Sequence, residues 1–469
     1  MEENFDTYPD PELTELVRKY EKMIRNGDPF FLDVEEFEDI VEFYFYRNEN
    51  DKALSCIRIA LGQHPGDPRL LLKEANILVQ AGEKEEVIRL LEEIGELDYL
   101  DPETCQGMGN IYSQMEKPEK AIEYFTLALR NAEDADEIHA GIAFEYENLG
   151  RYDKAIEHLV TALKTNPEND ACLYELSFCF EITKQTSRSA EFLQEFIDRH
   201  PFSKAAWFNL GIAFTNSELF EKAIEAYDYC LAIDDRFASA YFNKANCFAS
   251  LERFDEAIET YLESVRYEDP EPVTYYYIAE CYEKLGKYGP AVEYFRKAID
   301  LDPEFADAWV GTGMAFDSMV KSQSALPYIQ KAIQIAPAIS DYWFILGDLQ
   351  IKMNRIEEGI QSYRKVTEME PEDPEIWLEL SLVYSGQKQY ELAIETLKEG
   401  LKWHEQNPDF HYGLATYLLK SGKVKQAYEM LAKALHMDYD GHLRLFRVFP
   451  ELRNNKEITA LIESFREKR

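Results

Sequence analysis

Apolar residues recur along most of the chain in a pattern that repeats every 34 residues. Each repeat holds two apolar stripes with the i, i+3, i+4, i+7 spacing of amphipathic helices. In residues 204–237 the first stripe is Trp207, Leu210, Gly211 and Phe214, and the second is Ala223, Tyr227, Cys230 and Leu231. The pattern therefore predicts a pair of helices in every repeat.

With Val34 as position 1, this frame runs through Gly441 without an insertion or a deletion. It gives twelve repeats, which start at residues 34, 68, 102, 136, 170, 204, 238, 272, 306, 340, 374 and 408. Position 20 is Ala in nine repeats, and small residues there and at position 8 would let the paired helices approach closely. Proline falls at position 1 in five repeats, where its fixed φ and missing N–H suit a first helical turn. We therefore predict twelve helix pairs over residues 34–441.

The two ends depart from the repeat, as terminal repeats of such arrays do. Residues 11–26 form one amphipathic helix that is out of phase with the frame, and we expect residues 1–33 to cap the first repeat. After Gly441 the apolar pattern continues weakly, and Pro450 would cut the next helix short. We expect residues 442–469 to form a degenerate hairpin that caps the other end.

The order of residues within a repeat resembles the tetratricopeptide repeat (TPR) family. Residues 204–237 carry its pattern almost whole, except that Asp235 stands in the place of the final proline. The resemblance implies an all-α fold: a right-handed superhelical solenoid of stacked antiparallel helix pairs, with about twelve repeats plus terminal caps. It also implies a concave groove that binds polypeptide segments.

The charge of the chain narrows the class of partner. Its 89 acidic and 50 basic residues give a net charge of −39, which argues against nucleic-acid binding and against docking on an anionic membrane. No apolar run reaches the length of a transmembrane helix, and no signal peptide is visible. Seven scattered cysteines indicate no disulfide framework, so we expect a cytoplasmic protein.

Signatures of catalysis and of cofactor binding are missing from the sequence. It contains no G-x-x-x-x-G-K-[ST], G-x-S-x-G, H-E-x-x-H or C-x-x-C motif. The unbroken frame also leaves no inserted loop in which an active site could be built. We therefore predict that the protein is not an enzyme and that it has no cofactor and no metal site.

Acidic residues are concentrated at positions 2, 5, 9 and 12, which the resemblance places along the groove. These positions hold fifteen acids and one base, Arg69. Seven of the acids are at position 2, where a first-turn carboxylate favours the helix macrodipole. The other eight are Glu38, Glu42, Glu147, Glu181, Glu280, Glu283, Asp317 and Asp348, and helix capping does not explain them. Many lysines lie on the second helices instead.

Aromatic and amide side chains mark the middle of the expected groove. Position 5 is aromatic in four successive repeats, and amides stand at positions 6 and 9. The candidate peptide-binding residues are Tyr174, Phe208, Asn209, Phe242, Asn243, Asn246, Tyr276 and Glu280. Aromatic rings provide contact area and amides can pair with a peptide backbone. The alternative is that the rings fill gaps between adjacent first helices.

These features lead to one hypothesis and two alternatives. The hypothesis is a non-catalytic scaffold that holds a basic or mixed basic and apolar polypeptide segment in an acidic, aromatic-lined groove. The alternatives are a scaffold that assembles with itself and a regulatory subunit of a separately encoded enzyme. The sequence does not decide the oligomeric state.

Overall fold

The computed structural model describes residues 11–27, 31–97, 100–132, 135–443, 446 and 450–466. Within these ranges all regular structure is helical, and neighbouring helices pack as pairs, so the all-α fold of stacked helix pairs is confirmed. The chain forms two compact units, an N-terminal unit of Met1–Asp235 and a C-terminal unit of Arg236–Arg469.

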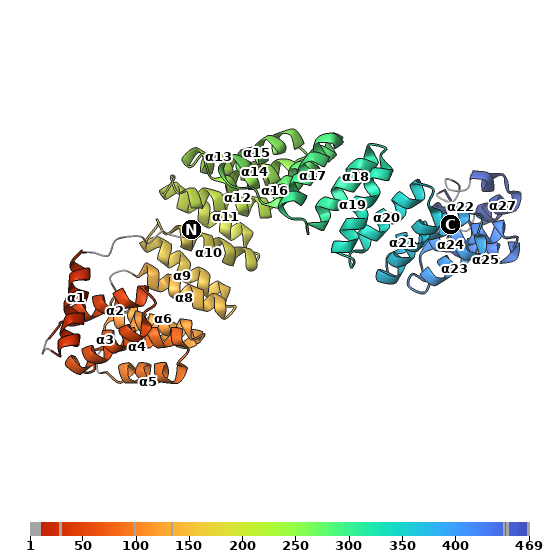
Figure 1. The fold of residues 1–469 in the computed structure, drawn as a ribbon. Coiled ribbons are helices and arrows are strands. Elements are labelled where there is room, and N and C mark those ends of the chain that lie inside the picture. The colour runs from red at the N-terminus through yellow and green to blue at the C-terminus, as the bar shows by residue number, and fades with distance from the viewer. Residues whose placement is uncertain are drawn as a thin grey trace. The chain divides into compact units, whose positions relative to one another are not determined.

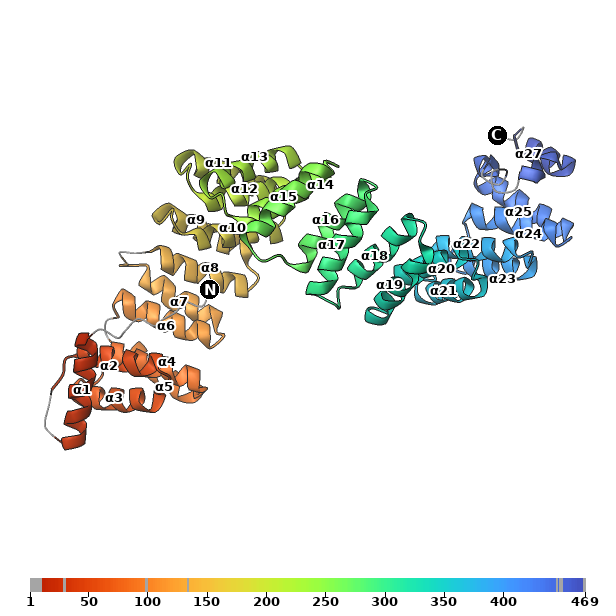
Figure 2. The ribbon, with the colours of Figure 1, turned by 45° about the horizontal axis from the view of Figure 1, so that its top comes forward.

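Helix pairs follow one another through both units, as the labels in Figures 1 and 2 show. The first helices of the pairs are α2 (Val34–Tyr46), α4 (Pro68–Ala81), α6 (Pro102–Gln114), α8 (Asp136–Asn148), α10 (Asp170–Ile182), α12 (Lys204–Asn216), α14 (Ala238–Ser250), α16 (Pro272–Lys284), α18 (Ala306–Ser318), α20 (Ser340–Lys352), α22 (Pro374–Gly386) and α24 (Pro408–Lys420). Each of them begins at position 1 of the repeat frame.

The second helix of each pair follows after a short turn. These helices are α3 (Asn50–Gln63), α5 (Lys84–Gly95), α7 (Pro118–Ala128), α9 (Tyr152–Thr165), α11 (Thr186–Arg199), α13 (Phe220–Ile233), α15 (Phe254–Tyr267), α17 (Tyr288–Leu301), α19 (Ser322–Ile335), α21 (Ile356–Met369), α23 (Tyr390–Gly400) and α25 (Val424–Met437). Outside the pairs lie α1 (Pro11–Asn26), the short 3-10 helices η1 (Tyr439–Gly441) and η2 (Pro450–Asn454), and α27 (Lys456–Arg466).

Side chains at the helix starts explain why the first helices begin where they do. Asp67 Oδ1 accepts hydrogen bonds from the backbone N–H groups of Arg69 and Leu70, at 3.0 and 3.3 Å. Asp101 Oδ1 accepts one from the N–H of Thr104 at 2.7 Å. These carboxylates satisfy N–H groups that have no partner within the helix. The helix starts are therefore encoded locally.

The turn inside every pair uses one residue in the left-handed conformation, with φ between 56° and 81°. These residues are Asn48, Gly82, Glu116, Gly150, Lys184, Glu218, Glu252, Gly286, Val320, Asn354, Lys388 and Gly422, and all of them occupy position 15. Glycine and asparagine adopt this conformation readily, whereas a β-branched residue does not. Val320, at φ 60°, is therefore strained, and its side chain is 85% exposed.

Because of this strain, we expect Val320→Asn to stabilise the C-terminal unit. Relief of the left-handed backbone penalty should contribute about 1 kcal/mol, since that conformation costs an L-residue roughly 1–2 kcal/mol. Urea unfolding of the full chain measures the change. The reverse exchange in the next repeat, Asn354→Val, should destabilise by a similar amount. Equal stability of both variants and the parent protein would show that position 15 carries no strain.

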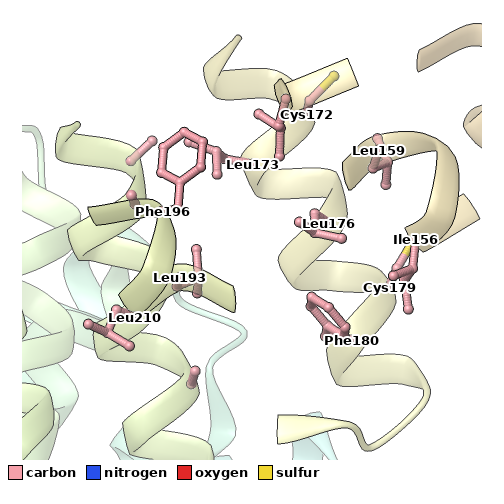
Figure 3. Close-up of a cluster of buried hydrophobic side chains, with 14 of the residues drawn as sticks. Ile156, Leu159, Cys172, Leu173, Leu176, Cys179, Phe180, Leu193, Phe196 and Leu210 are labelled. Carbon is pink, nitrogen blue, oxygen red and sulfur yellow. The ribbon is translucent and has the colours of Figure 1, made fainter. Parts of the chain in front are cut away.

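The core lies between the helix layers, and α10 illustrates how it is built. Leu173, Leu176 and Phe180 point from α10 toward its neighbours, with Leu159 of α9 on one side and Leu193 of α11 on the other (Figure 3). All seven cysteines of the chain are free and buried in such positions. The cysteines therefore act as small apolar core residues.

Helices outside the pairs cover the apolar surface of the terminal repeats. Val17 and Tyr20 of α1 are buried in one cluster with Phe37 and Ile40 of α2. At the other end, the short helix η2 and the helix α27 form an apolar cluster with α24 and α25. Its buried members include Leu431, Leu435, Leu452, Ile458 and Ile462. Parts of the expected caps, residues 1–10, 28–30, 444–445, 447–449 and 467–469, lie outside the described residues.

No helix in the described ranges has both the length and the apolar character needed to cross a membrane.

Candidate functional site

In the N-terminal unit, the position-5 rings differ in their environment. Tyr174 on α10 is exposed, whereas Phe208 on α12 is only 8% exposed. The two rings meet edge to face, with centroids 6.3 Å apart, and Phe208 also lies against Tyr227 at 6.0 Å. Phe208 therefore fills a gap between helices, and a continuous exposed stripe at position 5 is not present in this unit.

Asn209 on α12 is also unavailable to a partner. Its side chain is 2% exposed, and its Nδ2 has no hydrogen-bond partner among the described residues. A cavity of about 10 Å³ adjoins it, which has room for about one water molecule. The expectation that Asn209 binds a peptide backbone is therefore wrong. Its register within α12 turns the side chain into the helix interface, which the frame alone did not reveal.

In the C-terminal unit, Phe242 and Asn243 of α14 line a cavity of about 270 Å³. The end of α15 and the loop before α16 form its opposite wall. Three exposed acids of that loop, Glu268, Asp269 and Glu271, stand at its rim. We call this site the acid-rimmed cavity. It combines an aromatic wall, an amide and carboxylates, which suits a cationic side chain.

The other candidates of this unit are engaged by their own neighbours. Asn246 Oδ1 accepts a hydrogen bond from the hydroxyl of Tyr261. The Tyr276 hydroxyl donates to Glu280 Oε1 at 3.1 Å, and its ring packs 5.5 Å from that of Phe295. Burial raises the pKa of Glu280, and the Tyr276 hydrogen bond opposes this rise. Asn246, Tyr276 and Glu280 are therefore already engaged in contacts within the chain.

An exposed apolar patch lies on α8 and α10, and Tyr174 is the one member of it among the residues predicted from the sequence. Its members are Phe144, Tyr174, Phe178 and Ile182, which are 55%, 38%, 46% and 49% exposed. Phe144 and Phe178 both occupy position 9, and we call these four residues the apolar patch. The signal was present in the sequence, because Phe144, Phe178 and Ile212 stand 34 residues apart. Exposed apolar side chains that gather on one surface mark interaction sites.

Carboxylates lie on the same helices as the apolar patch. Glu147, one turn after Phe144 on α8, is half-buried and close enough to Glu175 of α10 to interact with it. Burial and the proximity of Glu175 raise the pKa of Glu147 to about 7, although a hydrogen bond with Cys179 opposes the rise. Glu175 and Glu181 on α10 are exposed. Because a nearby cation would favour the charged form of Glu147, the patch suits a basic group beside an apolar one.

Several of the other groove acids already have partners within the chain. In the N-terminal unit, Lys73 pairs with Glu42, and Arg69 lies 3.7 Å from Glu38. In the C-terminal unit the acids with internal partners include Asp317, 2.8 Å from Lys352, and Asp348, which accepts a hydrogen bond from Tyr363. These contacts make the net negative charge along the groove smaller than the count of acidic residues suggested. The reason is that bases at positions 6 and 13, Lys73 and Lys352, also reach the groove acids.

No group of three or more His, Cys, Asp or Glu side chains in the described part of the chain is arranged to hold a metal ion. The imidazoles of His139 and His158 meet at 2.8 Å between their Nδ1 atoms. Two nitrogens alone fall short of the three or four protein ligands of a zinc site.

The chain matches family models described as tetratricopeptide repeat over more than half of its length. The matched residues are 102–134, 136–169, 184–236, 220–271, 272–305, 340–373 and 384–445. A comparison with curated proteins gives no match.

Solved structures with a similar fold include three at low sequence identity. YrrB, a TPR protein with an unusual peptide-binding site, is 19% identical over 42% of this chain and 99% of its own, with a TM-score of 0.36. A tetratricopeptide repeat protein from Parabacteroides merdae ATCC 43184 is 16% identical over 53% of this chain and 98% of its own, with a TM-score of 0.39. The APC/C hetero-tetramer Cut9–Hcn1 is 16% identical over 89% of this chain and 93% of that chain, with a TM-score of 0.38.

The family assignment rests on the matching family models and on the observed helix pairs. Repeats of this kind form scaffolds for protein–protein interaction. The chain belongs to the tetratricopeptide repeat family.

Proposed function

We propose that the protein is a non-catalytic scaffold that binds a basic or mixed basic and apolar polypeptide segment. The observation that carries the proposal is the apolar patch, in which Phe144 and Phe178 are exposed beside Glu147, Glu175 and Glu181. A segment with alternating apolar and cationic side chains would satisfy both features of this surface at once.

The aromatic rings and the carboxylates would contribute to binding in different ways. Covering exposed aromatic rings removes apolar area from water, and each Å² contributes roughly 25 cal/mol. The carboxylates add less to affinity than to the rate and the specificity of association, because exposed charges are screened by salt. The rings should therefore anchor the segment, and the acids should select its charge.

The acid-rimmed cavity supports the same chemistry in the C-terminal unit. A lysine or arginine side chain could place its stem against Phe242 and its charge near Glu268 and Asp269. This arrangement supports binding of a basic residue independently of the apolar patch.

The test uses a capped peptide of about 12 residues in which Lys or Arg alternates with Leu or Phe. Fluorescence anisotropy measures its binding to the protein. We expect Phe144→Ala/Phe178→Ala to weaken binding by roughly tenfold or more, as removal of buried aromatic anchors does. Affinity should fall between about 50 and about 500 mM salt. It should rise as the pH increases through about 7, where Glu147 gains its charge, and Glu147→Gln should flatten that dependence.

A matched control is Phe202→Ala, which removes an almost fully exposed ring from the turn before α12. It should bind like the parent protein. Equal binding of a charge-reversed peptide, or full binding by the double variant, would refute the proposal. A change of light scattering with dilution, lost in the double variant, would instead assign the patch to self-assembly.

A further inference from the structure

A cavity opens between second helices of the N-terminal unit. This cavity, of about 500 Å³, lies between α9 and α11. Its apolar lining is Val160 and Leu163 of α9 with Phe192 and Phe196 of α11. Figure 3 shows Phe196 on α11 beside Leu173 of α10, so that this ring forms part of the cavity floor. We call this site the second-helix cavity.

The rim of the second-helix cavity is basic, although the chain as a whole carries a charge of −39. Lys164 comes from the last turn of α9, and Arg199 and His200 come from the end of α11. The one acid at the rim, Glu195, lies 3.5 Å from Arg199 and is paired with it. Lys164 is exposed and forms no ion pair with another described residue. The rim therefore has an excess of positive charge.

Helix capping accounts for only part of this arrangement. A cation in the last turn of a helix interacts favourably with the macrodipole, which explains one base at the end of each helix. It does not explain why Val160 and Phe192 remain partly exposed between those bases. The His200 ring also packs against Phe196, with centroids 4.8 Å apart. This contact holds the His200 imidazole at the rim, together with the side chains of Lys164 and Arg199.

The C-terminal unit provides an internal comparison, because the equivalent helices α17 and α19 also enclose a cavity, of about 420 Å³. There, Asp300 occupies the position of Lys164, and Arg296 occupies that of Val160. Arg296 is engaged, since it donates a hydrogen bond to the Tyr328 hydroxyl at 2.6 Å. The combination of an apolar lining and a rim lysine that is unpaired among the described residues therefore distinguishes the second-helix cavity from the cavity between α17 and α19.

We propose that the second-helix cavity binds an acidic and apolar segment of a partner protein. One or two apolar side chains of the segment enter between Val160, Phe192 and Phe196, and a carboxylate about one turn away meets Lys164 and Arg199. Phe192 and Arg199 are two turns apart on α11, about 10 Å along the helix axis, so the trough matches successive side chains of a peptide. The charge of this partner is opposite to that of the segment proposed for the apolar patch.

The probe is a capped, fluorescent peptide of about 12 residues that combines Leu and Phe with Glu, added to the full-length protein. We expect saturable binding that weakens with salt and that Lys164→Glu weakens by about tenfold or more. The matched control is Lys425→Glu, which reverses an exposed lysine on the second helix α25 and should leave binding unchanged. Phe144→Ala/Phe178→Ala should also leave it unchanged, and the basic peptide should not compete.

Other results would overturn the proposal. Binding that is insensitive to both salt and Lys164→Glu would show that the basic rim does not take part in recognising the peptide. Loss of binding in the Phe144→Ala/Phe178→Ala variant would place the acidic peptide on the apolar patch. Flotation with anionic lipid vesicles in the absence of peptide binding, or self-association abolished by Lys164→Glu, would assign the cavity to a membrane or to a second copy. The acidic peptide tests the second-helix cavity and the basic peptide tests the apolar patch. A negative result with the acidic peptide therefore leaves the proposal for the apolar patch unaffected.

Discussion

The Phe295→Ala variant should lose about 3–5 kcal/mol of stability in the C-terminal unit, as removal of a fully buried aromatic ring does. Phe295 on α17 is 1% exposed and packs against the ring of Tyr276. Its ring also fills the space above Gly311 of α18, where an added Cβ would lie 2.4 Å from the ring Cζ. The close approach of α17 and α18 leaves little freedom for neighbouring side chains to close the cavity.

Urea unfolding combined with hydrogen exchange measures this loss, because a repeat protein can open locally. Gly311→Ala should also destabilise, by about 1–3 kcal/mol, since it forces the Phe295 ring out of its place. The two changes in one chain should cost less than their sum. Trp403→Ala, which removes an exposed ring, serves as the control and should stay within about 0.5 kcal/mol. Strict additivity would show that Phe295 and Gly311 do not share the space.

Truncation after Gly441 should cause the protein to associate and precipitate. The removed segment contains Leu452, Ile458 and Ile462, which are buried against α24 and α25. Each such side chain contributes roughly 1.5–3 kcal/mol through burial. Their loss would expose Leu431 and Leu435 on α25. An uncovered end of a repeat array offers the same apolar surface that a further repeat would cover.

Light scattering at matched concentrations compares the truncated and the full chain. In the full-length protein, Ile458→Asp should produce a milder form of the same association, because it places a charge in the cluster. Lys456→Ala, at an exposed site at the start of α27, should behave like the parent protein. A truncated chain that remains monomeric and equally soluble would show that residues 442–469 do not cap the last repeat.

Much of the fold was accessible from the sequence because it depends on local features. Asp67 and Asp101 stand next to proline at helix starts, and both accept the backbone bonds expected of an N-cap. The alternation of two apolar stripes predicted the pairs. The left-handed residue at position 15 could also be inferred where it is glycine, as at Gly286, but Val320 gives no such signal in its side chain.

The candidate site was less predictable, because exposure is decided between helices. Phe208 and Tyr174 share position 5, yet one is buried against Tyr227 and the other is exposed. Asn209 is buried, and Glu42 is paired with Lys73, although both were expected to face the groove. Neighbouring repeats carry different side chains, so equivalent positions are covered to different extents.

The sequence by itself therefore determined the helix pairs, their register and the family, because these follow from a periodicity that each repeat carries in full. It also determined an excess of acid on the first helices. Only the tertiary structure decided which of those acids remain available, that Phe144 and Phe178 form the exposed patch, and that a basic cavity opens between α9 and α11. The physical reason is that burial, and ion pairs such as Lys73–Glu42, depend on side chains from different helices, which meet only when the helices pack and the repeats stack.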